Sequence, residues 1–185
     1  GELRAAEAVA VDGGLELRLD LAAGCAWRLR ERRRTLAGRT GCGLCGVESL
    51  AQVRRQLPPV PALVLQRAAL ARAADALQAH QPLQAQTGAT HAAAWCARDG
   101  ALRLVREDVG RHNALDKLIG ALLRQGADRG DGFVLVTSRA SFEMVQKTAA
   151  AGIGALAAVS APTALAVQTA RELNLALAGF VRGSD

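Results

Sequence analysis

FVLVTSRASFEMVQKTAAAGIGALAAV, residues 133–159, alternates apolar runs of strand length with one segment of helix length. The first run, Phe133–Thr137, and the last, Ala155–Val159, are continuous and uncharged, as in strands that a sheet buries on both faces. Between them, Phe142–Ala151 has the length and the apolar content of a helix. A strand, a helix and a strand in this order are typical of α/β proteins, so the stretch predicts an α/β fold.

The same alternation continues on both sides of this stretch. Ala92–Ala97 and Leu102–Val105 flank Asp99-Gly100, which is a hairpin signal between two strands. Periodic apolar residues predict helices over 66–79, 113–124 and 163–172 and a strand over 175–181. The order from residue 92 onward, β-β-α-β-α-β-α-β, predicts a mixed sheet with parallel members and with helices on its faces.

The first third of the chain predicts a small β/α segment. Two short strands, Ala8–Val11 and Leu15–Leu19, are joined at Asp12-Gly13-Gly14, which is a second hairpin signal. Residues 26–37 fit a strand or a helix, and residues 47–56 predict a short helix.

A proline-rich link at residues 57–61 is the best internal boundary. It divides the chain into an N-terminal segment, residues 1–61, and a larger domain, residues 62–185. At 185 residues the chain is long enough for one domain with a real core and a smaller appendage.

Two cysteines lie three positions apart in the glycine-rich stretch Gly41-Cys42-Gly43-Leu44-Cys45-Gly46. Glycine permits positive φ angles, so the backbone can approach a reacting partner closely. A thiolate is the reactive form of cysteine, and nearby cations or a helix N-terminus favour it. Because an arginine-rich run precedes the stretch and a predicted helix follows it, we expect low thiol pKa values and a reactive sulfur loop.

Other interpretations of these two cysteines fit less well. A structural zinc site takes four ligands, but the remaining cysteines are isolated and the three histidines are scattered, so we expect no metal site. A structural disulfide or a thioredoxin-like pair would need a secretory signal or a β-α-β context. The match to G-x-G-x-x-G lacks the preceding buried strand of a dinucleotide site, and we discard it.

The net charge of +6 is concentrated rather than spread. Residues 28–39 hold six arginines against one glutamate, a local net charge of +5. With three Phe, two Trp and no Tyr, the chain lacks the interleaved aromatic residues that stack nucleic-acid bases, so an acidic protein or an anionic cofactor is the expected partner. No signal peptide opens the chain, and the uncharged run at 148–170 contains glycines and a proline, so we expect a cytoplasmic protein with no membrane span.

Three predicted strand-to-helix junctions have polar residues that could cap helices or bind an anion. They cover residues 107–112, 137–141 and 159–163, and the first two contain arginine. In open α/β sheets, ligands bind beyond the carboxyl ends of the strands, where helix N-termini present free N–H groups. Each junction alone is better explained as a helix cap, but the three together predict an anion or phosphate site.

Four stretches resemble the FdhD family of formate dehydrogenase accessory sulfurtransferases: RRRTLAGRTGCGLCGVE at 32–48, THAAA at 90–94, EDVGRHNALDK at 107–117 and SRASFEMVQK at 138–147. The resemblance implies a sulfur carrier that takes sulfane sulfur from a cysteine desulfurase. It implies delivery to a molybdenum or tungsten bis(pterin guanine dinucleotide) cofactor, in the form that formate dehydrogenase requires. It also implies a homodimer and a cytidine-deaminase-like α/β/α domain. Deaminase chemistry itself is not expected, because the zinc-binding cysteines of deaminases are absent from the 138–142 junction.

The resemblance also assigns residues. Cys42 and Cys45 are the expected catalytic thiols, with Cys42 at the persulfide position. The expected contacts to the guanine nucleotide, for which GDP is an analogue, are His112, Arg139, Ser141, Phe180, Val181, Arg182 and Gly183, with His91 a weaker candidate. The family pattern leads us to expect a further segment before Gly1 and one more strand after Asp185.

Overall fold

The computed structural model describes residues 2–12, 14–30, 57–61 and 63–183. The chain forms two compact units, Gly1–Val53 and Arg54–Asp185, and each is described here by itself. The predicted sulfur loop and the predicted helix at 47–56 lie outside the described residues.

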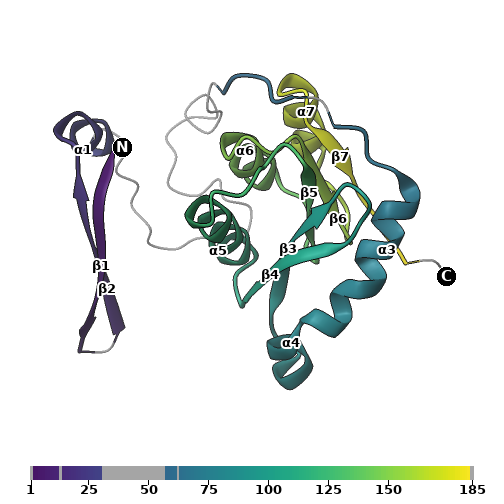
Figure 1. Cartoon of the computed structure of the whole chain (residues 1–185), viewed down its shortest axis with the longest axis horizontal. Helices are drawn as coiled ribbons and strands as arrows, with labels where there is room; N and C mark the ends of the chain where they lie inside the picture. Colours follow the sequence, from purple (N-terminus) through teal and green to yellow (C-terminus); the bar gives the residue numbers. More distant parts are fainter. Residues whose placement is uncertain (1, 13, 31–56, 62, 184–185) are drawn as a thin grey trace. The chain divides into compact units, whose positions relative to one another are not determined.

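The first unit contains the predicted hairpin (Figure 1). Strand β1, Leu3–Val11, pairs antiparallel with β2, Gly14–Leu21, and helix α1, Ala23–Arg30, follows. Three leucines of β2 lie opposite alanines of β1, in the pairs Leu15–Ala10, Leu17–Ala8 and Leu19–Ala6. Residues that face each other across a ladder share one face of the sheet, so these side chains lie on the same face. Residues 26–37 fit a strand or a helix in the sequence, and the described part of this segment is helical up to Arg30.

The second unit contains every strand and helix predicted for residues 62–185, and also a short helix that was not predicted. The sheet has the order β4-β3-β5-β6-β7. Its strands are β3 (His91–Ala97), β4 (Leu102–Asp108), β5 (Gly132–Val136), β6 (Ala155–Ala158) and β7 (Ala176–Ala178). The helices are α3 (Arg67–Leu77), the 3-10 turn η1 (Gln78–His80), α4 (Pro82–Thr87), α5 (Arg111–Arg124), α6 (Phe142–Ala150) and α7 (Ala164–Glu172).

The sheet is mixed, as predicted. Strand β3 is antiparallel to both of its neighbours, β4 and β5, whereas β5, β6 and β7 are mutually parallel. Strand β4 therefore runs in the same direction as β5, β6 and β7. The carboxyl ends of these four strands and the amino end of β3 lie at one edge, which we call the carboxyl edge.

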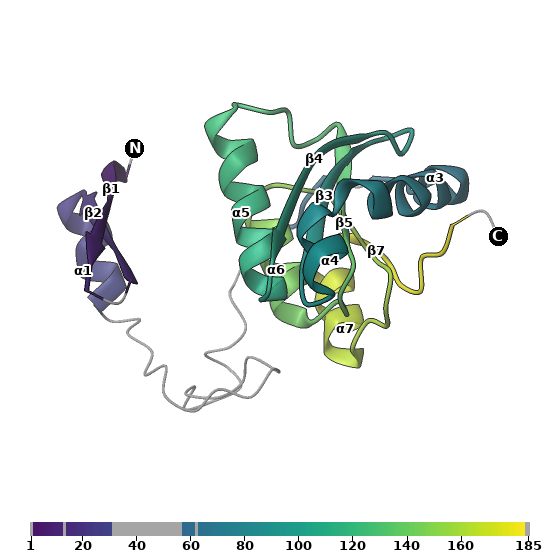
Figure 2. The ribbon, with the colours of Figure 1, turned by 90° about the horizontal axis from the view of Figure 1, so that it is seen from below.

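Helices cover both faces of this sheet and make three layers (Figures 1 and 2). Helix α3 packs on one face through Ala69, Ala73 and Leu77. Helices α5, α6 and α7 pack on the opposite face. Successive residues of β5 alternate between the two cores: Phe133 and Leu135 face α3, and Val134 and Val136 face the other three helices. A strand buried on both faces explains the uninterrupted apolar run in the sequence.

A turn and a connecting segment pack closely against the helices of the second unit. Gly100 has a φ of +89° in the β3–β4 turn, and a Cβ atom there would meet the Ala69 carbonyl oxygen of α3 at 2.2 Å, so only glycine fits. Val60 of the proline-rich link is buried, and its N–H donates to the Leu173 carbonyl at 2.9 Å. Asn174 donates to the Val60 carbonyl at 3.1 Å, so this link is an integral part of the second unit.

Candidate functional site at the carboxyl edge

Backbone hydrogen bonds bring the predicted junctions together at the carboxyl edge. Thr137 donates its N–H to the Ala92 carbonyl at 3.1 Å, and its Oγ1 accepts from the Ala92 N–H at 2.9 Å. The second and third junctions are joined by Ala140 N–H to the Ala161 carbonyl at 3.2 Å and by Thr163 N–H to the Ala140 carbonyl at 3.0 Å. Loops that are distant in sequence therefore lie side by side.

The stretch after β7 runs along the same edge. Phe180 donates its N–H to the Ser160 carbonyl at 3.2 Å, and Val181 donates to the Ala158 carbonyl at 3.0 Å. Arg182 Nη1 donates to the Val159 carbonyl at 3.0 Å. Val181 is buried, whereas Phe180 is 62% exposed and has a left-handed φ of 55°. Such a φ is uncommon for a bulky residue. In this turn the ring of Phe180 lies outside the core.

The start of α6 contains two of the predicted ligand contacts, Arg139 and Ser141. Ser141 is the N-cap residue and is 7% exposed, but its Oγ has no hydrogen-bond partner within the described part of the chain. Arg139 is exposed two positions earlier. An N-terminus with free N–H groups and a nearby cation is the arrangement that binds anions.

His112 links the first turns of α5 and α6. Its Nε2 lies 3.5 Å from Oε2 of Glu143, and both side chains are mostly buried. Burial lowers the pKa of His112, and the carboxylate of Glu143 only partly opposes this effect. The imidazole is therefore neutral near pH 7, with one nitrogen that donates and one that accepts.

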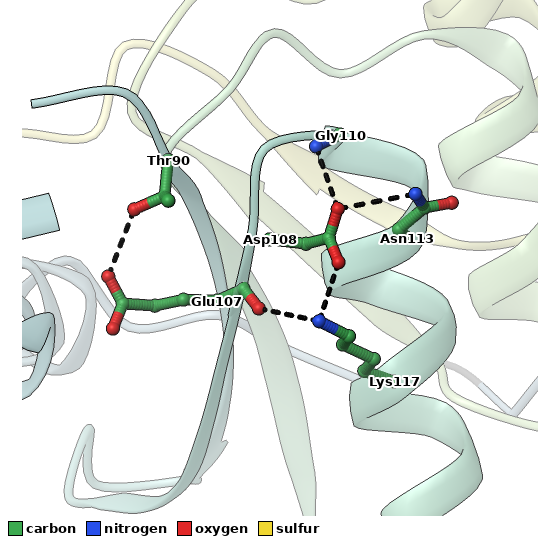
Figure 3. Close-up of polar contacts among 6 residues, drawn as sticks. All are labelled: Thr90, Glu107, Asp108, Gly110, Asn113 and Lys117. Atoms are coloured by element: carbon green, nitrogen blue, oxygen red, sulfur yellow. Dashed lines mark hydrogen bonds and ion pairs between the residues drawn. The ribbon is translucent and has the colours of Figure 1, made fainter. Parts of the chain in front are cut away.

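The last two residues of β4, Glu107 and Asp108, point to opposite sides of the strand (Figure 3). Each of them holds a different helix. Glu107 accepts the N–H groups of Leu83 and Gln84 at 3.0 and 2.8 Å, in the first turn of α4, and the hydroxyl of Thr90 at 3.1 Å. The sequence predicts that this strand ends at Val105 and that Glu107 begins a strand-to-helix junction. Pairing with the start of β3 extends the strand to Asp108.

Asp108 holds the opposite side. It accepts the Gly110 N–H at 2.9 Å and the Asn113 side-chain amide at 3.2 Å, and it forms an ion pair with Lys117. Lys117 also donates to the Glu107 carbonyl at 3.1 Å. Lys117, followed by the Gly110 N–H, lowers the pKa of Asp108. Asp108 therefore fixes the start of α5, which carries His112.

A cavity of about 600 Å³ opens beside Glu107, between the α3–α4 region and the ends of β3 and β5. Its lining consists of Gln78, Gln81, Gln84, Gly88, Ala89, Thr90, His91 and Thr137. The weaker candidate His91 is thus placed in a cavity, and burial, together with the charge of Arg111, lowers its pKa. The cavity was not predicted from the sequence because α4, which carries part of its lining, was not predicted. Pro82 at the first helical turn and Gly88 just after the end are the signal that could have identified this helix.

The catalytic thiols predicted for the loop, Cys42 and Cys45, lie outside the described residues. Cys25 is half-buried and free, and Cys96 is buried in β3, where burial raises its pKa to about 12. The Cys96 thiol is therefore not a replacement for the predicted pair. Across residues 2–30 and 57–183, apart from the gaps stated above, no group of three or more His, Cys, Asp or Glu side chains could hold a metal ion. No described helix is both long and apolar enough to span a bilayer.

Comparison with known proteins identifies the family. The family model described as FdhD/NarQ matches residues 3–185. A protein of Bordetella petrii and one of Variovorax paradoxus, each named sulfur carrier protein FdhD, are 57% identical to the whole chain. A protein of the same name from Cupriavidus necator is 60% identical over 91% of the chain. The chain spans 66% of the length of the first two relatives and 59% of the third.

A crystal structure from Desulfotalea psychrophila has the same fold, with a TM-score of 0.67 and 23% sequence identity. It is described as a candidate formate dehydrogenase accessory protein, and the match covers the whole chain and 67% of that protein. The family match over nearly every residue and the close relatives agree. The chain belongs to the FdhD/NarQ family.

Proposed function

We propose that this protein is a sulfur carrier. It accepts sulfane sulfur from a cysteine desulfurase and transfers it to a molybdenum bis(pterin guanine dinucleotide), which is its substrate, for use by formate dehydrogenase. The observation that carries the proposal is the identity of 57% over all 185 residues to relatives named sulfur carrier protein. The cysteine pair in its glycine-rich setting supplies the chemistry that such a carrier needs.

The first step is a thiol exchange. The Cys42 thiolate attacks the outer sulfur of the donor persulfide, a new S–S bond forms on Cys42, and the donor leaves as a thiolate. No external oxidant or reductant is required, because one S–S bond replaces another. Arginines at 28–39 favour the thiolate form of Cys42 before the attack.

Cys45 has a supporting role in this proposal. It lies nearer the predicted helix at 47–56, where it either tunes the neighbouring thiol or helps to release sulfur through a transient disulfide. In release through a disulfide, the Cys45 thiolate attacks Sγ of Cys42, the S–S bond of the persulfide breaks, and the outer sulfur leaves as sulfide to the acceptor. A reducing thiol then converts the Cys42–Cys45 disulfide back to two thiols.

The carboxyl edge is the proposed binding site for the guanine nucleotide. Arg139 and the α6 N-terminus supply positive charge for a diphosphate, and the unpartnered hydroxyl of Ser141 adds a hydrogen-bonding group. The neutral imidazole of His112 and the exposed ring of Phe180 lie on elements of the same edge. The substrate has two nucleotide arms, so a two-fold homodimer with one arm in each subunit is part of the proposal.

Intact mass spectrometry tests the proposal directly. The protein is incubated with a cysteine desulfurase and cysteine and then weighed without reduction. We expect the mass of added sulfur on the wild type and on Cys45→Ser, where loading is reduced, and none on Cys42→Ser. Neither substitution should change the fold, which circular dichroism checks.

Two outcomes would change the proposal. If the wild type gains no sulfur, a chaperone that binds the cofactor without carrying sulfur becomes the better description. If Cys45→Ser loses all loading and Cys42→Ser keeps it, the roles of the two thiols are reversed.

A further inference from the structure

The cavity beside Glu107 differs chemically from the rest of the carboxyl edge. Its eight lining residues, all in the described part of the chain, include no Lys, Arg, Asp or Glu. The lining consists of three glutamine amides, two threonines, one histidine and two small residues. Its volume, about 600 Å³, is within the range of small-molecule sites. A diphosphate would find no cation among these residues, so the cavity favours an uncharged polar group.

Several of its hydrogen-bonding groups are not used by the protein. The side chains of Gln78 and Gln81 make no hydrogen bond to any described residue. Gln84 uses only its oxygen, which accepts the Thr90 N–H at 2.8 Å and the Thr90 hydroxyl at 3.3 Å. Because an N–H can only donate, this contact fixes the orientation of the amide and leaves Nε2 of Gln84 as a donor for a ligand.

Glu107 keeps this lining in place. It holds the first turn of α4 through two backbone N–H groups. It also accepts the hydroxyl of Thr90 (Figure 3). Two contacts therefore fix the position of Gln84. Its backbone N–H donates to Glu107, and its side-chain oxygen accepts from Thr90. Glu107 is a positioning residue, since it is not itself among the residues that line the cavity.

Glutamine amides match one kind of uncharged group particularly well. A side-chain amide presents a donor and an acceptor side by side, and it pairs with a heterocycle edge that has the complementary pattern. Guanine and pterin rings share such an edge, an aminopyrimidinone with N–H donors beside a carbonyl acceptor. Both rings occur in the substrate under the proposed function, on which this step rests.

We propose that the glutamine-lined cavity at the amino end of β3 is a subsite for an uncharged aminopyrimidinone ring, separate from the cationic region at α6. Gln81 and the Nε2 group of Gln84 read the donor and acceptor edge of the ring. His91, which is neutral and also lines the cavity, supplies one more donor or acceptor. Charged diphosphate is held elsewhere on the edge.

The test uses calorimetry on the whole chain with three probes: guanosine, pterin and inorganic pyrophosphate. The key variant is Gln81→Leu, because this side chain makes no hydrogen bond to another described residue that the substitution would break. The matched control is Gln86→Leu in α4, the helix for which Gln81 is the N-cap residue, because Gln86 lies outside the cavity lining. Thermal unfolding of each variant checks that the fold is kept.

We expect at least one of the two rings to bind the wild type and to bind Gln81→Leu about tenfold more weakly, as for the loss of one good hydrogen bond. Gln86→Leu should bind within about twofold of the wild type, and pyrophosphate affinity should not depend on Gln81. If Gln81→Leu weakens the binding of guanosine alone, the cavity is assigned to guanine, and if it weakens the binding of pterin alone, to pterin. If the binding of both is weakened, the cavity recognises the edge that the two rings share. The inference is overturned if neither ring binds, or if Gln81→Leu and Gln86→Leu bind the rings equally.

This result is independent of sulfur loading, which intact mass measures on the same protein. Sulfur loading without ring binding would refute the subsite alone. Ring binding without sulfur loading would refute the carrier function and leave the subsite standing.

Discussion

Replacing Glu107 by alanine should release α4 from the end of β4. The first N–H groups of a helix have no partner within the helix, and Glu107 is the acceptor for those of Leu83 and Gln84. A lost N-cap interaction costs about 1 kcal/mol, and hydrogen bonds to a charged acceptor contribute somewhat more. Because these contacts are only partly buried, we expect about 2 kcal/mol of local stability to be lost.

Hydrogen exchange followed by NMR measures this effect at individual amides. A loss of about 2 kcal/mol corresponds to roughly 30-fold faster exchange for the Leu83 and Gln84 N–H groups. Asp108→Ala is the matched control, because Asp108 is the adjacent carboxylate and holds the opposite side of the strand. It should accelerate exchange at Gly110 and leave the two α4 amides unchanged. Wild-type exchange at Leu83 and Gln84 in Glu107→Ala would refute the assignment of Glu107 as the residue that holds α4.

Four further predictions concern ligand binding, pH dependence and the core. Arg139→Ala should weaken GDP binding about tenfold in calorimetry, and equal affinity would remove Arg139 from the site. Burial lowers the pKa of His112 below its ordinary 6.5, so on acidification the unfolded chain binds a proton at this residue before the folded protein does. The free energy of unfolding should therefore fall as pH drops below about 6.5. His112→Gln should reduce this slope in urea titrations. Lys117 lowers the pKa of Asp108, so the stabilising contribution of this carboxylate is present above about pH 3.8 and is lost on acidification. Asp108→Asn should be less stable than the wild type at about pH 7, and the difference in the free energy of unfolding should shrink in acid. Leu118→Ala removes a fully buried side chain of α5 and should cost about 2–5 kcal/mol in denaturant unfolding, and a cost under 1 kcal/mol would contradict its place in the core.

Hydrophobic periodicity was sufficient to predict most elements of the second unit. The run at 133–137 is apolar throughout because both faces of β5 are covered, and α5 has buried residues at helical spacing. The β3–β4 hairpin was predictable because its turn requires a glycine, which Gly100 supplies. These signals are local: each depends on a few neighbouring residues and on which of their side chains avoid water.

The predicted ligand contacts of the carboxyl edge were only partly accessible from local signals. Strand-to-helix junctions and helix caps could be identified in the sequence, and the backbone contacts among them agree with a shared edge. The assignment of individual residues to a guanine nucleotide came from family resemblance and stays a prediction, as do the roles of Cys42 and Cys45.

Other features depend on contacts between residues that are far apart in the chain. Helix α4 has a polar sequence with no apolar stripe, so periodicity did not reveal it, and Glu107, 23 residues after Gln84, holds its first turn. The polar end of β4 is strand only because it pairs with the start of β3. The neighbour order of the strands, and with it the neutral cavity beside a cationic edge, likewise comes from long-range pairing. Local sequence specifies the elements because burial and turn geometry act over a few residues, whereas the partners of a polar side chain are set only when the whole sheet assembles.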